Sequence, residues 1–218
     1  MSEFSNILNT VDVLGPLIAC ICFWLLKQKI SFELELVKWF CLVQLVCNGT
    51  AFLFDVLQLK NYWIYELNML VSFAILLWLF SKYLIDISKN KAKLIGAFVY
   101  LCIGTTYYFY GWDNSFNSYG MALTSVITVG FCLYFFYSRL INSSEELSIP
   151  DTSIFWCVVG IFTYFAGSFF IFISYKYLID SDSSTVSTLW RFHNILLLIC
   201  CLYISYGIIC KNYRTILS

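Results

Sequence analysis

Long runs of apolar residues, separated by short polar segments, alternate along the whole chain. The hydrocarbon core of a membrane is about 30 Å thick, and a helix crosses it with roughly 20 apolar residues. Seven runs meet this requirement, at 11–28, 37–59, 62–85, 94–112, 118–140, 153–177 and 186–210. The pattern predicts an all-α integral membrane protein, a seven-transmembrane-helix bundle that forms a single domain over residues 1–218.

Composition supports a membrane location. Of the 218 residues, 61% are hydrophobic and only 12% are charged. Soluble domains carry about 25% charged residues, so this chain has too little charge to cover a water-facing surface. The formal net charge is zero, which removes any argument from basicity for nucleic-acid binding. We therefore expect membrane lipids, and no nucleic acid, among its partners.

The basic residues indicate an orientation, because cytoplasmic loops of membrane proteins carry an excess of Lys and Arg. One side of the predicted bundle holds Lys27, Lys29, Lys38, Lys82, Lys89, Lys91, Lys93, Arg139, Lys211 and Arg214. The other side holds only Lys60, Lys176 and Arg191. The distribution predicts an N-terminus outside the cell and a C-terminus in the cytoplasm.

Spans one to three show weak, ordered similarity to spans five to seven. The third span begins with the residues Trp63-Ile64-Tyr65-Glu66-Leu67-Asn68, and the seventh contains Trp190-Arg191-Phe192-His193-Asn194 at the equivalent depth. This similarity suggests a 3+1+3 internal repeat, in which spans three and seven are related by a pseudo-two-fold axis along the membrane normal.

Few polar residues enter the predicted spans, and they cluster near one depth. A charge at mid-membrane costs about 2.5–3.5 kcal/mol on insertion scales, so such residues face the bundle interior, water or a partner. The candidate ligand-binding residues are Asp55, Glu66, Asn68, Arg191, His193 and Asn194, with Asn48 extending the polar stripe toward mid-membrane. We expect Glu66 or Asp55 to pair with Arg191 in an outward-opening cavity. The alternative is that the same pair is a structural clamp, or that Arg191 only extends to the interface.

His193 is the only histidine, which excludes a zinc site of several His ligands. A neutral histidine bonded to a neighbouring helix is the commoner arrangement, and a proton switch is the alternative. Because no nucleophile and base are paired in the pattern, we expect no enzymatic activity, no metal and no cofactor.

Several aromatic motifs carry a family resemblance. They are Asn61-Tyr62-Trp63-Ile64-Tyr65; Ser153-Ile154-Phe155-Trp156 with Gly160 and Tyr164; and Leu189-Trp190 with Asn194, Tyr203 and Tyr206-Gly207. With these motifs the chain resembles small seven-span membrane proteins of Bacteroidetes-type bacteria, which implies a bacterial inner (plasma) membrane location and suggests signalling. The topology is also similar to that of the SWEET and PQ-loop transporters, although their Pro-Gln signature is absent.

Two functions fit this pattern. The first is a heptahelical receptor or sensor, in which a small molecule or lipid enters the outer cavity and the basic loop Lys82–Lys93 contacts a separate cytoplasmic or membrane signalling partner. Binding to anionic lipid headgroups is the alternative for this loop and the commoner use of such lysines. The second is a small-solute transporter built from two three-helix repeats.

Overall fold

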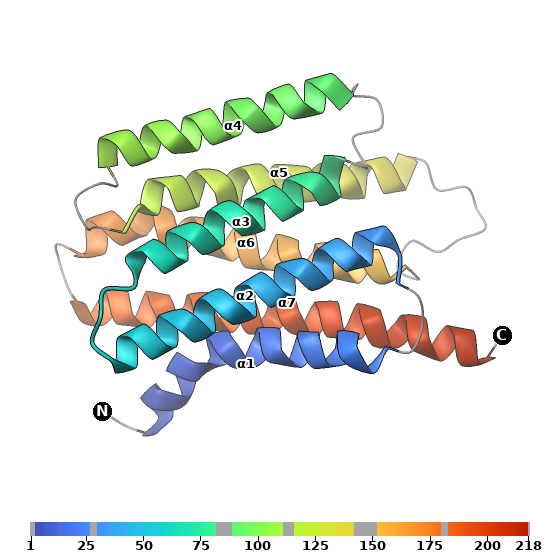
Figure 1. Ribbon diagram of the computed structural model, residues 1–218, viewed down its shortest axis with the longest axis horizontal. Helices are drawn as coiled ribbons and strands as arrows, with labels where there is room; N and C mark the ends of the chain where they lie inside the picture. The colour runs from blue at the N-terminus through green and yellow to red at the C-terminus, as the bar shows by residue number, and fades with distance from the viewer. Residues whose placement is uncertain are drawn as a thin grey trace.

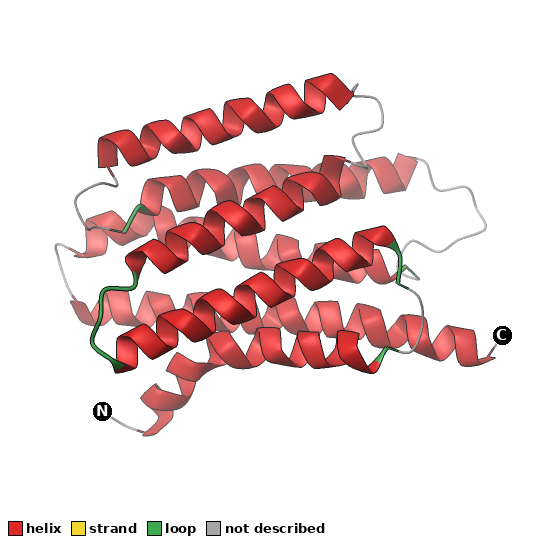
Figure 2. Ribbon diagram, in the orientation of Figure 1, coloured by secondary structure: helices red, strands yellow, loops and turns green. Residues whose placement is uncertain are grey.

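The computed structural model describes residues 3–26, 30–81, 89–110, 116–141, 152–179 and 183–217. Over these residues the chain forms seven α-helices and its ordered elements are all helical (Figures 1 and 2). They are α1 (Glu3–Leu25), α2 (Phe32–Val56), α3 (Tyr62–Ser81), α4 (Lys89–Tyr110), α5 (Ser118–Ile141), α6 (Ser153–Ile179) and α7 (Ser183–Leu217).

Five of these helices contain a stretch long and apolar enough to cross a membrane. The stretches are Phe32–Val56, Tyr62–Ser81, Ser118–Arg139, Ser153–Tyr175 and Thr185–Ile209. In α1 and α4 the described apolar stretches are shorter, Thr10–Leu25 and Gly96–Thr106. The all-helical, multi-pass character predicted from the sequence is confirmed at this level.

The helices run roughly parallel or antiparallel to one another in a bundle (Figure 1). Consecutive helices pack together in the groups α1–α2–α3 and α5–α6–α7. The two groups meet where α1 packs on α7, where α3 packs on α5, and where α2 touches α6. Helix α4 lies at the edge of the bundle, against α3 and α5 (Figure 1). We call the end at which α2 passes into α3 the α2–α3 end.

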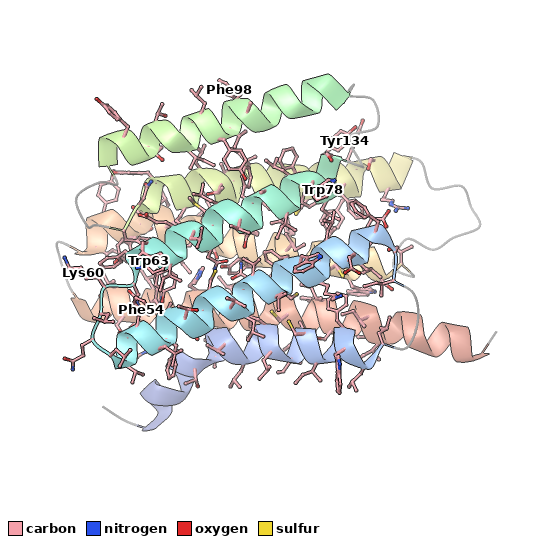
Figure 3. The ribbon with its side chains drawn as sticks, viewed as in Figure 1. Phe54, Lys60, Trp63, Trp78, Phe98 and Tyr134 are labelled. Carbon is pink, nitrogen blue, oxygen red and sulfur yellow. The ribbon has the colours of Figure 1, made fainter. Side chains whose placement is uncertain are left out.

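The turn at the α2–α3 end is a well-formed helix stop. The backbone N–H of Leu59 donates to the carbonyl of Phe54 at 2.8 Å, and that of Gln58 donates to Asp55 at 3.0 Å. This pair of bonds is the Schellman arrangement, which needs a left-handed residue, and Gln58 supplies it with a φ of 56°. Phe54 and Trp63 then meet edge to face across the turn, at 5.8 Å between ring centroids (Figure 3).

Helix α1 is interrupted by Pro16. A proline inside a helix has no N–H to donate to the carbonyl four residues earlier, and its ring pushes on that carbonyl. Here the carbonyl is that of Asp12, and the first turns of α1 depart from the line of the rest of the helix (Figure 1). The side-chain amide of Asn48 on α2 donates to the Asp12 carbonyl at 3.4 Å. The missing helix bond is thus replaced from a neighbouring helix.

Helices α6 and α7 approach each other closely at glycines. A Cβ added at Gly160 would lie 2.7 Å from the carbonyl oxygen of Cys200, and one at Gly207 would lie 2.7 Å from that of Ser153. Backbone therefore touches backbone at both points, which only glycine permits. Small residues at helix interfaces are the usual means of close packing in lipid, where apolar burial alone gives no driving force between helices.

The half of the bundle opposite the α2–α3 end is filled by a large apolar cluster, which we call the apolar plug. Its buried side chains include Phe23, Leu34, Val37, Phe40, Leu76, Leu79, Phe80, Cys132, Phe135, Ile154, Val158 and Ile208. They come from the end of α1, the start of α2, the ends of α3 and α5, the start of α6 and the later part of α7. Polar side chains collect in the other half.

Helix boundaries differ from the predicted spans mainly at polar ends. Helix α2 begins at Phe32 and not at 37, because its first turn carries Glu33 and Glu35. Acidic residues stabilise the start of a helix by interacting with its dipole. A search for apolar runs nevertheless excludes them, so the predicted span begins later than the helix. Residues 82–88, and the side chains of the basic loop Lys82–Lys93, lie outside the described residues.

Candidate functional site

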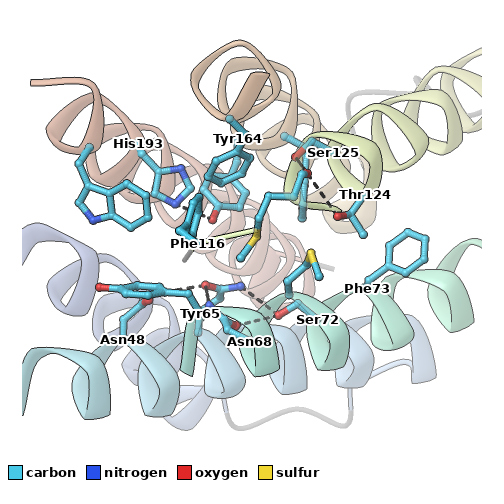
Figure 4. Close-up of a pocket in the computed structure, with 16 residues that line it drawn as sticks. Asn48, Tyr65, Asn68, Ser72, Phe73, Phe116, Thr124, Ser125, Tyr164 and His193 are labelled. Carbon is cyan, nitrogen blue, oxygen red and sulfur yellow. Dashed lines mark hydrogen bonds between the residues drawn. The ribbon is translucent and has the colours of Figure 1, made fainter. Parts of the chain in front are cut away.

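A small cavity of about 40 Å³ lies inside the bundle, between α2 and α3 on one side and α5, α6 and α7 on the other (Figure 4). Its lining is Gln44, Asn48, Tyr65, Asn68, Met69, Ser72, Phe73, Phe116, Met121, Thr124, Ser125, Tyr164, Phe165, Phe172, Trp190 and His193. A water needs roughly 10–15 Å³ on this measure, so the inner cavity has room for a few waters and not for a larger solute.

The α2–α3 wall of the inner cavity is a closed cycle of hydrogen bonds, which we call the polar ring. The Gln44 amide donates to the Ser72 hydroxyl at 3.0 Å, and this hydroxyl donates to the Asn68 carbonyl oxygen at 3.1 Å. The Asn68 amide donates back to the Gln44 carbonyl oxygen at 3.0 Å. Asn48 adds a longer bond to the same Gln44 oxygen at 3.4 Å. Through Asn48 the polar ring reaches the Asp12 carbonyl, so it joins α1, α2 and α3.

The opposite wall is organised around His193 on α7. Its Nε2 lies 3.2 Å from the Tyr164 hydroxyl and its Nδ1 lies 3.0 Å from the Ser168 hydroxyl, both on α6. The imidazole also packs against Phe172 and Trp190, at 5.1 and 5.3 Å between centroids. Figure 4 shows this wall facing the polar ring across the cavity. His193 thus has the neighbouring-helix bonds that the sequence favoured over a proton switch.

A second, larger cavity of about 360 Å³ lies at the α2–α3 end, and we call it the vestibule. It is lined by Asp12, Ala51, Phe52, Asp55, Asn61, Tyr62, Tyr65, Phe116, Tyr175, Val186, Ser187, Trp190 and Asn194. Asp55, Tyr62 and Ser187 are exposed, so the vestibule opens to the surroundings there. Asp12 and Asn194 are 8% and 3% exposed and lie at its inner wall.

Three aromatic side chains separate the two cavities. Tyr65, Phe116 and Trp190 line both of them. Trp190 meets Tyr65 edge to face at 5.3 Å between centroids and Phe116 at 5.4 Å. We call this set the aromatic gate. The aromatic gate therefore forms the boundary between the vestibule and the inner cavity.

The predicted site residues fall into three groups: those that line the inner cavity, those that line the vestibule, and those that line neither. Asn48, Asn68 and His193 line the inner cavity. Asp55 and Asn194 line the vestibule. Glu66 and Arg191 line neither of these cavities.

The expected pairing of Glu66 or Asp55 with Arg191 needs correction. Among the side chains that the structure describes, the one ion pair joins Lys38 to Glu35, at 3.0 Å. Helical phase explains the difference. Each residue advances about 100° around a helix, so Glu66 lies roughly 200° from Asn68, and Arg191 lies roughly 200° from His193. When Asn68 and His193 face the cavity, Glu66 and Arg191 point away from it.

Sequence reasoning missed Asp12, Gln44, Ser72 and Tyr164. Gln44 and Asn48 stand four residues apart, as do Asn68 and Ser72, so each pair shares a helix face. This four-residue spacing predicts a polar face on each of the two helices, and the polar ring forms where these faces meet. Asp12 carried a different signal, since it lies four residues before the only proline in the apolar runs. Tyr164 could not be separated from other aromatic residues of α6.

Fold and cavities together define a class: a helical, multi-pass membrane protein with a polar interior cavity beneath a vestibule. Compared with protein-family models, with curated proteins and with solved structures, the chain has no match in any of the three. Its function is therefore argued from the geometry of the two cavities.

Proposed function

We propose that the protein is a carrier for a small polar solute, built from two three-helix units, α1–α3 and α5–α7, that α4 connects. The observation that carries this proposal is the position of the inner cavity between the two units, with the vestibule above it. Transporters of repeated helices place their substrate site at the interface between the repeats, near the middle of the membrane.

The helix contacts support a two-unit design. If α1, α2 and α3 correspond to α5, α6 and α7, a two-fold operation turns the α1–α7 contact into an α5–α3 contact. Both contacts exist, and the α2–α6 contact that would lie on the axis exists too. The contacts within the first unit, α1–α2 and α2–α3, likewise have counterparts in α5–α6 and α6–α7. This pattern is the one expected of the 3+1+3 repeat suggested by the sequence.

We further propose that all seven helices span the inner membrane of a bacterium, with the vestibule facing outward. The support is the distribution of basic residues, since only Lys60, Lys176 and Arg191 belong to the α2–α3 end. In this orientation the solute enters the vestibule from outside. It reaches the polar ring only when movement of the two units widens the inner cavity, which in the present arrangement has room for a few waters. The apolar plug closes the cytoplasmic half, as alternating access requires of an outward-facing arrangement.

Uptake into proteoliposomes tests the carrier. Radiolabelled glucose, alanine and choline serve as one uncharged, one zwitterionic and one cationic probe. We expect saturable uptake of at least one probe, reduced about tenfold by Asn68→Ala because the inner cavity loses a buried hydrogen-bonding group. Thr50→Val is the matched control, because Thr50 is bonded only within its own helix, to the Val46 carbonyl at 2.7 Å, away from both cavities.

A heptahelical receptor is the second candidate, and one observation favours it. The inner cavity of about 40 Å³ is too small for a solute, and the polar ring and apolar plug close the way beyond it. In a receptor the ligand would stay in the vestibule and signal through a separate cytoplasmic or membrane partner. Saturable binding of a probe without uptake in the same proteoliposomes would favour the receptor over the carrier.

A further inference from the structure

We infer that the vestibule binds a small organic ammonium ion, with the carboxylate of Asp12 as its counter-charge and aromatic rings as its walls. The inference rests on the proposed function only in taking the vestibule as the place where the solute first enters the protein. It adds the chemical class of that solute.

The first observation is the state of Asp12. Its side chain is 8% exposed and lines the vestibule, and its Oδ1 atom is buried without a hydrogen-bond partner. An ionised carboxylate buried among apolar groups is costly unless a partner of opposite charge, or a proton, neutralises it. Pro16 fixes this residue at the bend of α1, and Asn48 holds its backbone carbonyl, so the carboxylate is held at the inner wall of the vestibule.

The second observation is the aromatic wall. Tyr65, Phe116, Tyr175 and Trp190 line the vestibule together with Tyr62. Trp190 is edge to face with Tyr65 at 5.3 Å and with Tyr175 at 6.3 Å between centroids, and Phe116 lies 4.9 Å from Tyr175. The rings are therefore set at steep angles to one another around one space. Aromatic faces arranged in this way attract alkylammonium groups through their negative faces.

The sign of the charge in the vestibule agrees with a cation. Its lining contains two acids, Asp12 and Asp55, and among the described lining residues there is no Lys, Arg or His. Lys60 in the nearby turn is exposed and does not line the vestibule. An anionic solute would meet two carboxylates there with no basic side chain to offset them.

Size and ligand set favour an organic cation over a bare metal ion. The volume of about 360 Å³ falls at the lower end of small-molecule sites, which span roughly 300–1,000 Å³. The described residues contain no group of three or more His, Cys, Asp or Glu side chains that could hold a metal ion. A molecule with an ammonium group and a few carbons fills the space, and the rings contact its carbon atoms.

The test compares choline with 3,3-dimethylbutanol, its uncharged carbon isostere, on the full-length protein in nanodiscs. Binding is followed by tryptophan fluorescence, because Trp190 lies in the vestibule wall. We expect saturable quenching by choline, with the isostere binding about tenfold more weakly or worse, and about a tenfold loss of choline affinity in Asp12→Asn. Glu66→Gln is the matched control, an acid on α3 outside both cavities, and should keep the wild-type affinity.

Several outcomes would overturn the inference. They are equal binding of the isostere, unchanged choline affinity in Asp12→Asn, equal quenching by sodium chloride, or no saturable quenching by choline, ethylammonium or tetramethylammonium. If Asp12→Asn does not fold, the comparison of choline with its isostere on the wild-type protein decides alone. The proposed carrier is judged separately: choline that binds without uptake keeps this inference and removes the carrier, whereas uptake of glucose without binding of any ammonium probe keeps the carrier and removes this inference.

Discussion

Gln44 is the residue on which the polar interior depends most. Its side chain donates one hydrogen bond and accepts two, and it bonds Ser72, Asn68 and Asn48. Two of these partners lie on α3 and one on α2, so Gln44 takes part in three of the four hydrogen bonds that form the polar ring and attach Asn48 to it. Within the bundle these groups have few other partners, although the unfolded helices in the membrane also find partners.

We therefore expect Gln44→Leu to lower the free energy of unfolding by about 1–2 kcal/mol, because it removes three hydrogen bonds and leaves the Asn68 amide without its acceptor. Unfolding by SDS in mixed micelles measures the change. Thr50→Val, on the same helix, removes only a bond from the Thr50 hydroxyl to the Val46 carbonyl and should cost much less. Equal losses in the two variants would mean that the polar ring does not stabilise the bundle.

At the scale of single residues, part of the candidate site could be predicted from the sequence. Asn48, Asn68, His193 and Asn194 are polar residues in apolar runs, and such residues turn inward to avoid lipid. Charge alone misled the prediction for Glu66 and Arg191, because each stands two residues from a cavity-lining residue of its own helix and therefore lies on a different helix face.

At the scale of elements, the helices were predictable and their contacts were not. An apolar run of about 20 residues predicts a membrane helix whatever its neighbours are. Which helices touch depends on side-chain shape along each face, and small residues mark contacts only where two backbones meet. Gly160 and Gly130 look alike in the sequence, yet Gly160 lies against α7 and Gly130 has no other atom within 4 Å of an added Cβ.

These two glycines give a paired prediction. Gly160→Ala should lower the free energy of unfolding by about 1–3 kcal/mol, because the new methyl group overlaps the Cys200 carbonyl and pushes α6 from α7. Gly130→Ala should change it little or raise it by up to about 1 kcal/mol through helix propensity. Thermal unfolding in detergent, followed by circular dichroism, compares them. A similar loss in both variants would contradict the close approach of α6 and α7.

At the scale of the whole molecule, the two ends of the bundle differ in chemistry. The α2–α3 end holds the vestibule and both of its acids, and the other end holds the apolar plug. An orientation in the membrane therefore decides which compartment supplies the solute. The distribution of basic residues predicts which end is cytoplasmic, and cysteine labelling measures it.

We expect Lys60→Cys to react with a membrane-impermeant maleimide added to intact spheroplasts, because Lys60 lies in the exposed turn at the end that we propose faces outward. Ser138→Cys, near the other end of α5, should react only after the membrane is opened. The wild-type chain provides the background from its own cysteines, several of which are buried in the apolar plug. Labelling in the reverse order would invert the proposed orientation.

In the proposed seven-span arrangement, the bend at Pro16 also bears on how α1 enters the membrane. Until Asn48 is in place, the Asp12 carbonyl lacks its usual helix donor, and an unpaired carbonyl in hydrocarbon costs several kcal/mol. Alone, α1 is for this reason a poor membrane helix. In the α1–α2 hairpin, Asn48 supplies the hydrogen bond that the Asp12 carbonyl lacks. We therefore expect α1 and α2 to insert as a pair during biosynthesis, with α2 donating the hydrogen bond that α1 lacks.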